Sequence, residues 1–301
     1  MSRPVVIFVP GMKPKPEPDL HRQQIWRTML EGVRRADEPV AASMAECGDC
    51  LTLTDWTWVF YNSRVDIEPD LAAIEELLRK PGPTDDDAAA ARSWGKRLKR
   101  FAYILGDTLP FLIPHLADER MQVTLQDVRR YLNDVGRIGR QVRRRLEIRL
   151  DAAWQEGRPV LLIGHSLGSV IAWDALWELS RVDAHPGRVD LFLTLGSPLG
   201  QRFVQRRLKG HDADGPERYP DNIRRWVNIA AIGELTALDR SFRRDYREML
   251  AAGLIEEIED YEVLNFFRRD GELNVHSEYG YLVNRTTGGV IADWWRSATA
   301  M

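Results

Sequence analysis

Residues 164–168, Gly-His-Ser-Leu-Gly, place a nucleophile between two glycines in the pattern G-x-S-x-G. The apolar run 158–163 before the pattern predicts a buried strand, and residues 169–173 after it predict a helix. Flanking glycines allow the strand and helix backbones to approach closely, so the serine oxygen can stand exposed at the tip of a tight turn. The segment therefore favours Ser166 as a nucleophile, with a structural glycine-rich turn as the alternative.

A serine that attacks a carbonyl carbon needs a base, and in enzymes with this motif the acid and then the histidine follow the serine along the chain. Three histidines lie after Ser166: His185, His211 and His276. His185 precedes a proline and His211 lies in a polar loop, which is typical of solvated positions. His276 follows the last apolar run, where the base is expected. A surface or capping histidine is the alternative at this position.

The acid must orient the histidine, and Glu234 is the first candidate because it follows the predicted strand 225–232 at its carboxyl end. Asp239 comes one helical turn later and is the second candidate. Asp260 is a weaker one. For each of the three carboxylates the simpler interpretation is a solvated charge.

With these segments in view, the chain resembles the bacterial α/β-hydrolases of the serine esterase and lipase type. The resemblance covers the N-terminal strand and the loop after it, the segment around Ser166, and the segments 194–200, 226–237 and 276–281. In that family the acid segment often has W-x-N followed by an aspartate and then V-A. Here Glu234 takes the aspartate position, and Thr236 replaces the valine.

The resemblance implies a Ser166-His276-Glu234 triad, an acyl-enzyme intermediate, and neither metal nor organic cofactor. It also implies an oxyanion hole made by two backbone amides, those of Met12 and Leu167. Met12 ends Pro10-Gly11-Met12, which follows the predicted strand 4–9 where the family usually has His-Gly-x. Pro10 replaces that histidine and leaves the Met12 amide available.

Apolar runs alternate with helical stretches along the chain, which predicts a mostly parallel sheet of about six strands with helices on both faces. The runs are 4–9, 51–60, 159–164, 189–195, 225–232 and 260–267. We expect residues 1–65 and 121–301 to form this α/β-hydrolase core.

Residues 66–120 do not follow the alternation, and Pro-Gly-Pro at 81–83 interrupts them. They predict a helical insertion. A basic stretch at 96–100 precedes the mostly apolar residues 101–114, an order that suits a lid over an acyl site that can touch lipid. An insertion packed on the core is the alternative.

Composition gives no reason to expect a nucleic-acid partner, because the net charge of the 301-residue chain is only -3. Arginines nevertheless crowd one predicted helix. They are Arg129, Arg130, Arg137, Arg140, Arg143, Arg144, Arg145 and Arg149. Interleaved acids favour a solvated, ion-paired helix face over an anion-binding surface. These acids are Asp127, Asp134, Glu147 and Asp151.

Cys47 and Cys50 are the two cysteines, too few for a tetrahedral zinc site without histidines nearby, and we expect free thiols. The first strand is too short for a secretory apolar region, and no run approaches the ~20 apolar residues of a membrane span. The sequence thus predicts a cytoplasmic protein and leaves peripheral membrane contact open.

These patterns together predict a serine hydrolase that cleaves small-molecule carboxylic esters or lipids. Two alternatives remain. One is a thioesterase or acyltransferase with the same triad, and the other is a non-catalytic binding module that keeps the fold.

Overall fold

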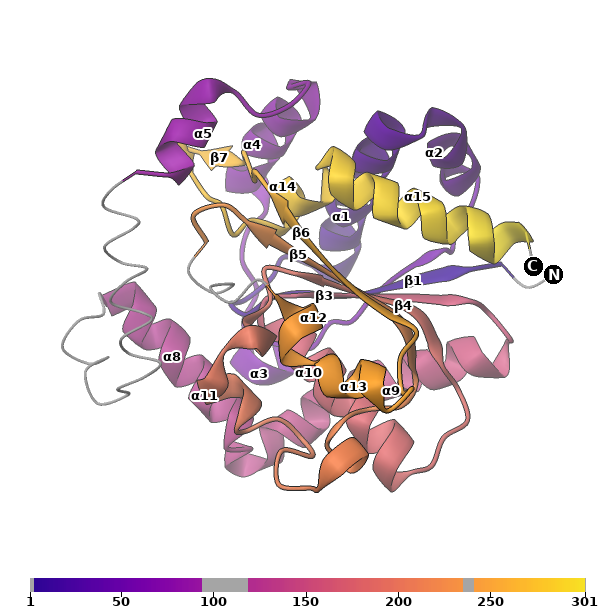
Figure 1. Ribbon diagram of the computed structural model, residues 1–301. Helices are drawn as coiled ribbons and strands as arrows, with labels where there is room; N and C mark the ends of the chain where they lie inside the picture. Colours follow the sequence, from indigo (N-terminus) through magenta and orange to yellow (C-terminus); the bar gives the residue numbers. More distant parts are fainter. Residues whose placement is uncertain (1–2, 94–118, 235–240, 301) are drawn as a thin grey trace.

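A computed structural model describes residues 3–93, 119–234 and 241–300 and shows a single parallel sheet between two layers of helices (Figure 1). The strand order is β2-β1-β3-β4-β5-β6, and every neighbouring pair is parallel. The strands are β1 (Val5–Val9), β2 (Leu51–Leu53), β3 (Val160–His165), β4 (Val189–Leu195), β5 (Ile223–Ala231) and β6 (Glu257–Val263). The α/β class and the six parallel strands predicted from the sequence are confirmed.

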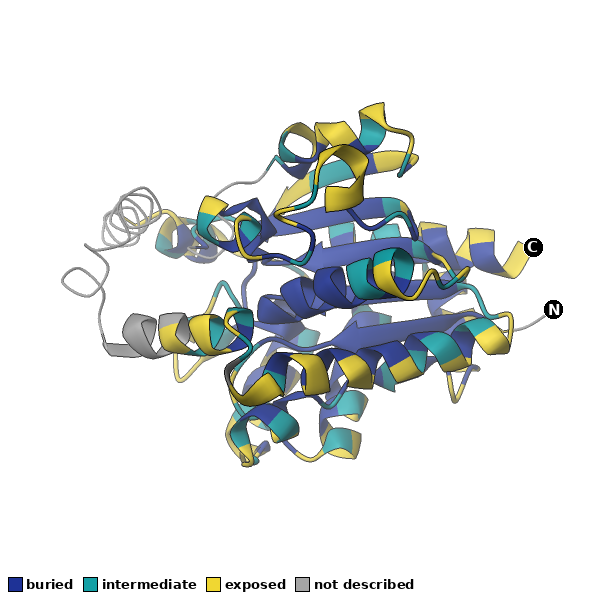
Figure 2. Ribbon diagram, turned by 90° about the horizontal axis from the view of Figure 1, so that it is seen from below, coloured by how far each residue is buried: buried dark blue, intermediate teal, exposed yellow. Residues whose placement is uncertain are grey.

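Alternate residues of each central strand face opposite layers, so the sheet is covered on both sides. In β1, Val6 and Phe8 face one core, while Val5, Ile7 and Val9 face the other. The first core is closed by α1 (Pro18–Ala36), α2 (Glu38–Ala45), α4 (Glu68–Arg79), α14 (Glu278–Leu282) and α15 (Arg285–Ala300). The second is closed by α3 (Thr57–Tyr61), α9 (Ile138–Gln155), α10 (Leu167–Trp177), α12 (Phe242–Asp245) and α13 (Arg247–Ala251). Figure 2 shows the central strands as buried along their length.

Other helices, turns and a hairpin join these elements. They are α5 (Asp85–Ala91), α8 (Glu119–Leu132), the 3₁₀ turn Val135–Arg137, the π-helical turn Glu178–Val182 that continues α10, the 3₁₀ turn Pro198–Gly200, α11 (Arg202–Gln205), the 3₁₀ turn Gly215–Arg218, and the hairpin of β7 (Arg268–Arg269) and β8 (Glu272–Leu273). None of the helices in the described ranges combines the length and apolar character that crossing a bilayer requires.

Two predicted strands have other bounds in the structure. The run 51–60 is strand only to Leu53, because the buried Trp56 indole donates to the Pro10 carbonyl at 2.8 Å and the chain turns there into α3. The last strand lies earlier than the run 260–267 predicts. Ile258 pairs with Trp226 in the sheet, whereas the apolar Phe266 and Phe267 are buried after the strand ends.

The first part of the predicted insertion 66–120 packs on the sheet. Ile74 and Leu77 of α4 are buried in the same core as Val6 and Phe8 of β1. The end of α5 lies against the turn after β5, since a Cβ built on Gly233 would come within 2.2 Å of the Ala91 carbonyl oxygen. The segment 94–114, which carries the predicted lid, falls within 94–118 and so outside the described residues.

Helices α1 and α15 touch through their backbones (Figure 1). A Cβ built on Gly288 would lie 1.9 Å from the carbonyl oxygen of Gly32. A side chain at this position would collide with α1, so the absence of a Cβ is what allows the two helices to pack here.

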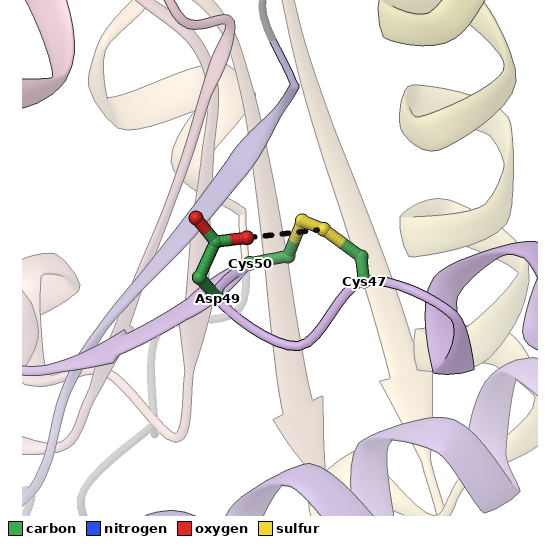
Figure 3. Close-up of side chains that lie close together, drawn as sticks. All are labelled: Cys47, Asp49 and Cys50. Atoms are coloured by element: carbon green, nitrogen blue, oxygen red, sulfur yellow. Dashed lines mark hydrogen bonds between the residues drawn. A yellow bond between two sulfur atoms is a disulfide. The ribbon is translucent and has the colours of Figure 1, made fainter.

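The expectation of free thiols is wrong: Cys47 and Cys50 form a disulfide between α2 and β2 (Figure 3). Their Cα atoms are 5.6 Å apart, within the range that a disulfide bridges, and both side chains are buried in the core. Asp49 Oδ1 lies 3.7 Å from Cys47 Sγ. Because a metal-binding cysteine must be a thiolate, the three residues cannot hold a metal while the disulfide is formed.

Candidate active site

Ser166 stands at the carboxyl end of β3, on the turn that the motif predicts. Its φ of 52° and ψ of -128° are unusual for a serine, a local strain that is common at functional sites. Both glycines of the motif are sterically required. A Cβ on Gly164 would lie 2.6 Å from Ser169 Cα, and one on Gly168 would lie 2.2 Å from the Val9 carbonyl oxygen. The Ser166 amide is held by the Leu195 carbonyl at 2.9 Å.

His276 reaches Ser166 from the loop after β8, with its Nε2 2.9 Å from Ser166 Oγ. The loop is fixed by two asparagines. Asn274 Oδ1 accepts the His276 amide at 3.1 Å, and the buried Asn265 donates to the Ser277 carbonyl at 2.8 Å. The His276 side chain is 34 % exposed, so the site is open to solvent on the side of the histidine.

Glu234 lies just beyond β5, where its buried carboxylate contacts His276 Nδ1. A carboxylate can only accept, so the imidazole proton belongs on Nδ1 and the Nε2 lone pair faces the serine hydroxyl. Gly196, with φ +55°, makes room for the acid, because a Cβ there would come within 2.6 Å of Glu234 Oε1. The structure thus brings together Ser166, His276 and Glu234, three residues that lie far apart in the sequence.

Tyr281 completes this arrangement and was not predicted. Its buried hydroxyl donates to Glu234 Oε2 and accepts the amide of Ala231 at 2.8 Å. In the sequence, nothing distinguishes Tyr281 from an aromatic residue of the core. Only its place one turn into α14, behind the acid, gives it this contact.

The other candidate bases and acids lie elsewhere. His185 stacks on Trp154 with ring centroids 4.8 Å apart, and His211 Nδ1 lies 3.0 Å from the Leu208 carbonyl oxygen in its own loop. Asp260 accepts the amides of Phe242 at 2.9 Å and Arg243 at 3.0 Å, at the start of α12. Asp239 falls within 235–240, outside the described residues.

The loop that carries Met12 lies directly against the serine. A Cβ on Gly11 would be 3.1 Å from Ser166 Cβ. The loop is anchored on both sides of Met12, by the bond from Trp56 to Pro10 and by the amide of Lys13, which donates to the Tyr61 hydroxyl at 3.1 Å. Leu167 is the first residue of α10, where helix amides have no partner in a preceding turn. The loop of Met12 and the first residue of α10 therefore both lie beside the nucleophile.

A buried carboxylate supports the helix that begins behind Ser166. Asp174 of α10 accepts the Tyr131 hydroxyl and the Lys209 amide, each at 2.8 Å. Burial raises the pKa of Asp174 to about 6, although both hydrogen bonds favour the charged form. Through Asp174, helix α10 is thus connected to α8 and to the loop after α11.

The arginines do not share one helix as predicted, because Arg129 and Arg130 end α8 and the chain turns at Val135–Arg137 before α9 begins. A cavity of about 980 Å³ opens along α9, lined by arginines such as Arg137, Arg140 and Arg145. The predicted pairing with acids of the same helix is seen for Arg144, whereas Arg143 is buried and pairs outside the helix. Arg143 Nε donates to Glu178 at 2.5 Å, and Arg144 lies 3.3 Å from Glu147. None of Ser166, Glu234 and His276 lines this cavity, so it is separate from the candidate site.

Comparisons with protein-family models, curated proteins and solved structures give no significant match to this chain. The arrangement of side chains is therefore what bears on function. It consists of a serine hydroxyl bonded to an imidazole, a carboxylate on the far ring nitrogen, and backbone amides beside the serine. This set of groups can perform nucleophilic acyl transfer.

Proposed function

We propose that this chain is a serine hydrolase of the α/β-hydrolase fold and that it cleaves carboxylic esters. One observation carries the proposal: His276 Nε2 lies 2.9 Å from Ser166 Oγ while Glu234 occupies the other ring nitrogen. A solvated serine, histidine or carboxylate has no reason to adopt this alignment. Two features support the hydrolase fold: the tight turn with Ser166 between β3 and α10, and the chain order in which the acid follows β5 and the histidine follows β8.

In the proposed reaction Ser166 Oγ attacks the ester carbonyl while His276 Nε2 takes its proton. The negative charge on the carbonyl oxygen is stabilised by the amides of Met12 and Leu167. Collapse of the tetrahedral intermediate expels the alcohol, which receives the proton from His276, and leaves the acyl group on the serine. Water, activated by the same histidine, then releases the carboxylic acid. No step requires a metal or an organic cofactor.

The proposal is tested by labelling with a fluorophosphonate probe, which reacts with activated serines. Wild type should be labelled on Ser166, and Ser166→Ala should abolish labelling. Ser180→Ala is the matched control, because Ser180 follows the same helix and its hydroxyl donates to the Trp177 carbonyl at 3.4 Å. A folded wild type that is not labelled would overturn the proposal in favour of a binding module.

The same triad could serve a thioesterase or an acyltransferase. A series of p-nitrophenyl esters from acetate to long acyl chains, compared with acyl thioesters, separates esterase from thioesterase activity. Partition of the acyl group between water and added alcohols separates hydrolysis from acyl transfer. We expect turnover of esters with water as the acceptor, and chain-length preference then defines whether lipids are substrates.

A further inference from the structure

A second buried carboxylate lies behind the triad. Glu278, at the start of α14, accepts Lys15 Nζ at 2.9 Å and His21 Nε2 at 2.7 Å on the same oxygen. Its other oxygen, Oε2, is 3.3 Å from His165 Nδ1. Glu278, His21 and His165 are all buried, and the Lys15 side chain is only 16 % exposed. These four residues, here called the Glu278 cluster, come from three distant parts of the chain.

The Glu278 cluster contacts the segments on both sides of the candidate nucleophile, the loop that carries Met12 and the loop that carries His276. Lys15 belongs to the loop that carries Met12, and His165 is the neighbour of Ser166. The ring of His165 lies 4.8 Å from the ring of His276, and its Nε2 is 3.0 Å from the His276 carbonyl oxygen. A carbonyl only accepts, so this ring nitrogen donates to the backbone of the candidate base.

The Glu278 cluster contains a buried ion pair between Lys15 and Glu278. Burial alone would raise the pKa of Glu278, but the contacts with Lys15 and His21 outweigh burial and hold that pKa well below its ordinary value. Burial likewise lowers the pKa of His165 and favours its neutral form. The Lys15 ammonium and the Glu278 carboxylate carry opposite charges 2.9 Å apart.

Other ionisable groups around Glu278 are accounted for. Asp70 of α4 interacts with both Lys15 and Glu278 but has its own partner, Arg269 of β7, at 2.8 Å. The Tyr279 phenol faces Glu278 and Asp70, and burial raises its pKa well above the ordinary value, so it stays neutral. His276, on the other side of the His165 ring, is a further ionisable group near Glu278.

We propose that Glu278 and Lys15 are positioning residues of the active site, a buried ion pair that fixes the Met12 loop and the His276 loop around Ser166. This inference rests on the proposed function. The physical reason is that a displacement of about 1 Å in a catalytic group can cost roughly 10²-fold in rate. Loss of one partner also leaves a buried charge without its counter-charge, next to the base.

The pH dependence of Ser166 labelling tests the ion pair directly. Glu278→Gln leaves a positive charge near His276, which disfavours the protonated base and should move the acid limb of the profile to lower pH. Lys15→Met leaves a negative charge and should move it to higher pH. Each shift should be on the order of 1 pH unit for a charge at this range. The double variant should return the limb towards wild type, because the two substitutions together remove one charge of each sign.

Rates give the second readout. Either single variant should lower kcat on p-nitrophenyl butyrate by about 10- to 100-fold with KM changed less than about threefold, since the loops position groups rather than bind the acyl chain. Glu17→Gln is the matched control. It removes a carboxylate two residues from Lys15 whose side chain is 68 % exposed, and it should change neither the rate nor the profile.

If Glu278 and Lys15 only stabilise the fold, their variants should lose stability without moving the acid limb of the labelling profile in opposite directions. If both folded single variants keep the wild-type acid limb, or move it the same way, the proposal is overturned. If Glu278→Gln does not fold, the shift of Lys15→Met to higher pH still decides. A wild type that is not labelled at all would overturn the hydrolase proposal and this inference with it, whereas a labelled wild type with unmoved variants overturns only the positioning role.

Discussion

The hydroxyl of Tyr281 donates to Glu234 Oε2, the oxygen that does not contact His276 Nδ1, and at the same time accepts the Ala231 amide at 2.8 Å. The phenol thus connects the acid to the end of the strand that precedes it. Because the other carboxylate oxygen contacts His276, both oxygens of Glu234 have a donor. The carboxylate plane is fixed from behind, and with it the ring of the histidine.

Tyr281→Phe should therefore lower kcat by roughly tenfold with little change in KM, because Glu234 loses one charge-assisted hydrogen bond but keeps its contact with His276. It should also lower the free energy of unfolding by about 1–3 kcal/mol, because the buried Ala231 amide loses its acceptor. Ester kinetics and urea denaturation measure the two effects. Tyr246→Phe is the control: its hydroxyl bonds to the Leu199 carbonyl at 2.8 Å, so stability should fall while kcat stays unchanged. Equal kcat for Tyr281→Phe and wild type would contradict the role of this contact.

Glu234→Gln should lower kcat by about 10²- to 10⁴-fold with KM nearly constant, because the triad acid fixes the tautomer and stabilises the imidazolium. Asp239→Asn should have a far smaller effect. Asp260→Asn should reduce stability, since it weakens the acceptor of two amides at the start of α12, but should leave kcat near wild type. Steady-state kinetics on one p-nitrophenyl ester compares the three. A larger loss in Asp239→Asn than in Glu234→Gln would reassign the acid.

Gly196→Ala should impair catalysis by displacing the acid. The new methyl group would lie 2.6 Å from Glu234 Oε1, on a residue whose φ of +55° already disfavours a side chain. We expect a loss of kcat of about 10²-fold or more, as for other misplaced catalytic groups. Gly215→Ala is matched in backbone conformation, with φ +53°, but nothing lies within 4 Å of its Cβ. It should cost only about 1–2 kcal/mol of stability and leave kcat intact. Similar kcat values for the two variants would contradict a catalytic role for the space that Gly196 leaves beside Glu234.

Asp174 should make stability depend on pH. Burial raises its pKa in the folded state to about 6 from an ordinary value of 3.8. For an acid with a raised pKa the contribution to stability is fully present below the unfolded value and is lost as the pH rises through the folded value. The lost contribution amounts to about 3 kcal/mol. Asp174→Asn does not titrate. The free energy of unfolding of wild type minus that of the variant should thus fall between pH 4 and pH 8 in urea denaturation, and a constant difference would contradict the buried-acid interpretation.

Local sequence patterns were sufficient for the sheet and for the three candidate catalytic residues. A strand of five or more buried residues shows as an apolar run, and the glycines around Ser166 are required by contacts within the turn and with the neighbouring strand. His276 and Glu234 could be predicted because each follows an apolar run, although the hairpin of β7 and β8 separates His276 from β6. The bounds of β2 could not, because the Trp56 indole turns the chain by bonding to Pro10, which is distant in sequence.

The supporting residues could not be predicted for a related reason. Tyr281 and Glu278 have ordinary sequence surroundings, and their partners Glu234 and Lys15 are brought near only by the packing of α14. The disulfide was missed because a C-x-x-C pair has several outcomes, which depend on burial and on Cα separation rather than on spacing. A pattern within one element can be recognised in the sequence, whereas a contact between two elements can be recognised only once their three-dimensional arrangement is known.

The contact of Gly32 with Gly288 has a consequence for the order of folding. Helices α1 and α15 together cover one face of the sheet, yet they stand at opposite ends of the described sequence. Closing so long a loop is slow and entropically costly, and contacts of this kind delay folding. Until α15 docks, the side chains of Val6 and Phe8 lack part of their cover, and a ribosome-bound chain exposes them to aggregation. His276 is synthesised just before this helix, so the candidate base and the cover of this face of the sheet become available late relative to α1. Regain of esterase activity should accordingly trail the regain of helical signal when the unfolded protein is diluted from denaturant.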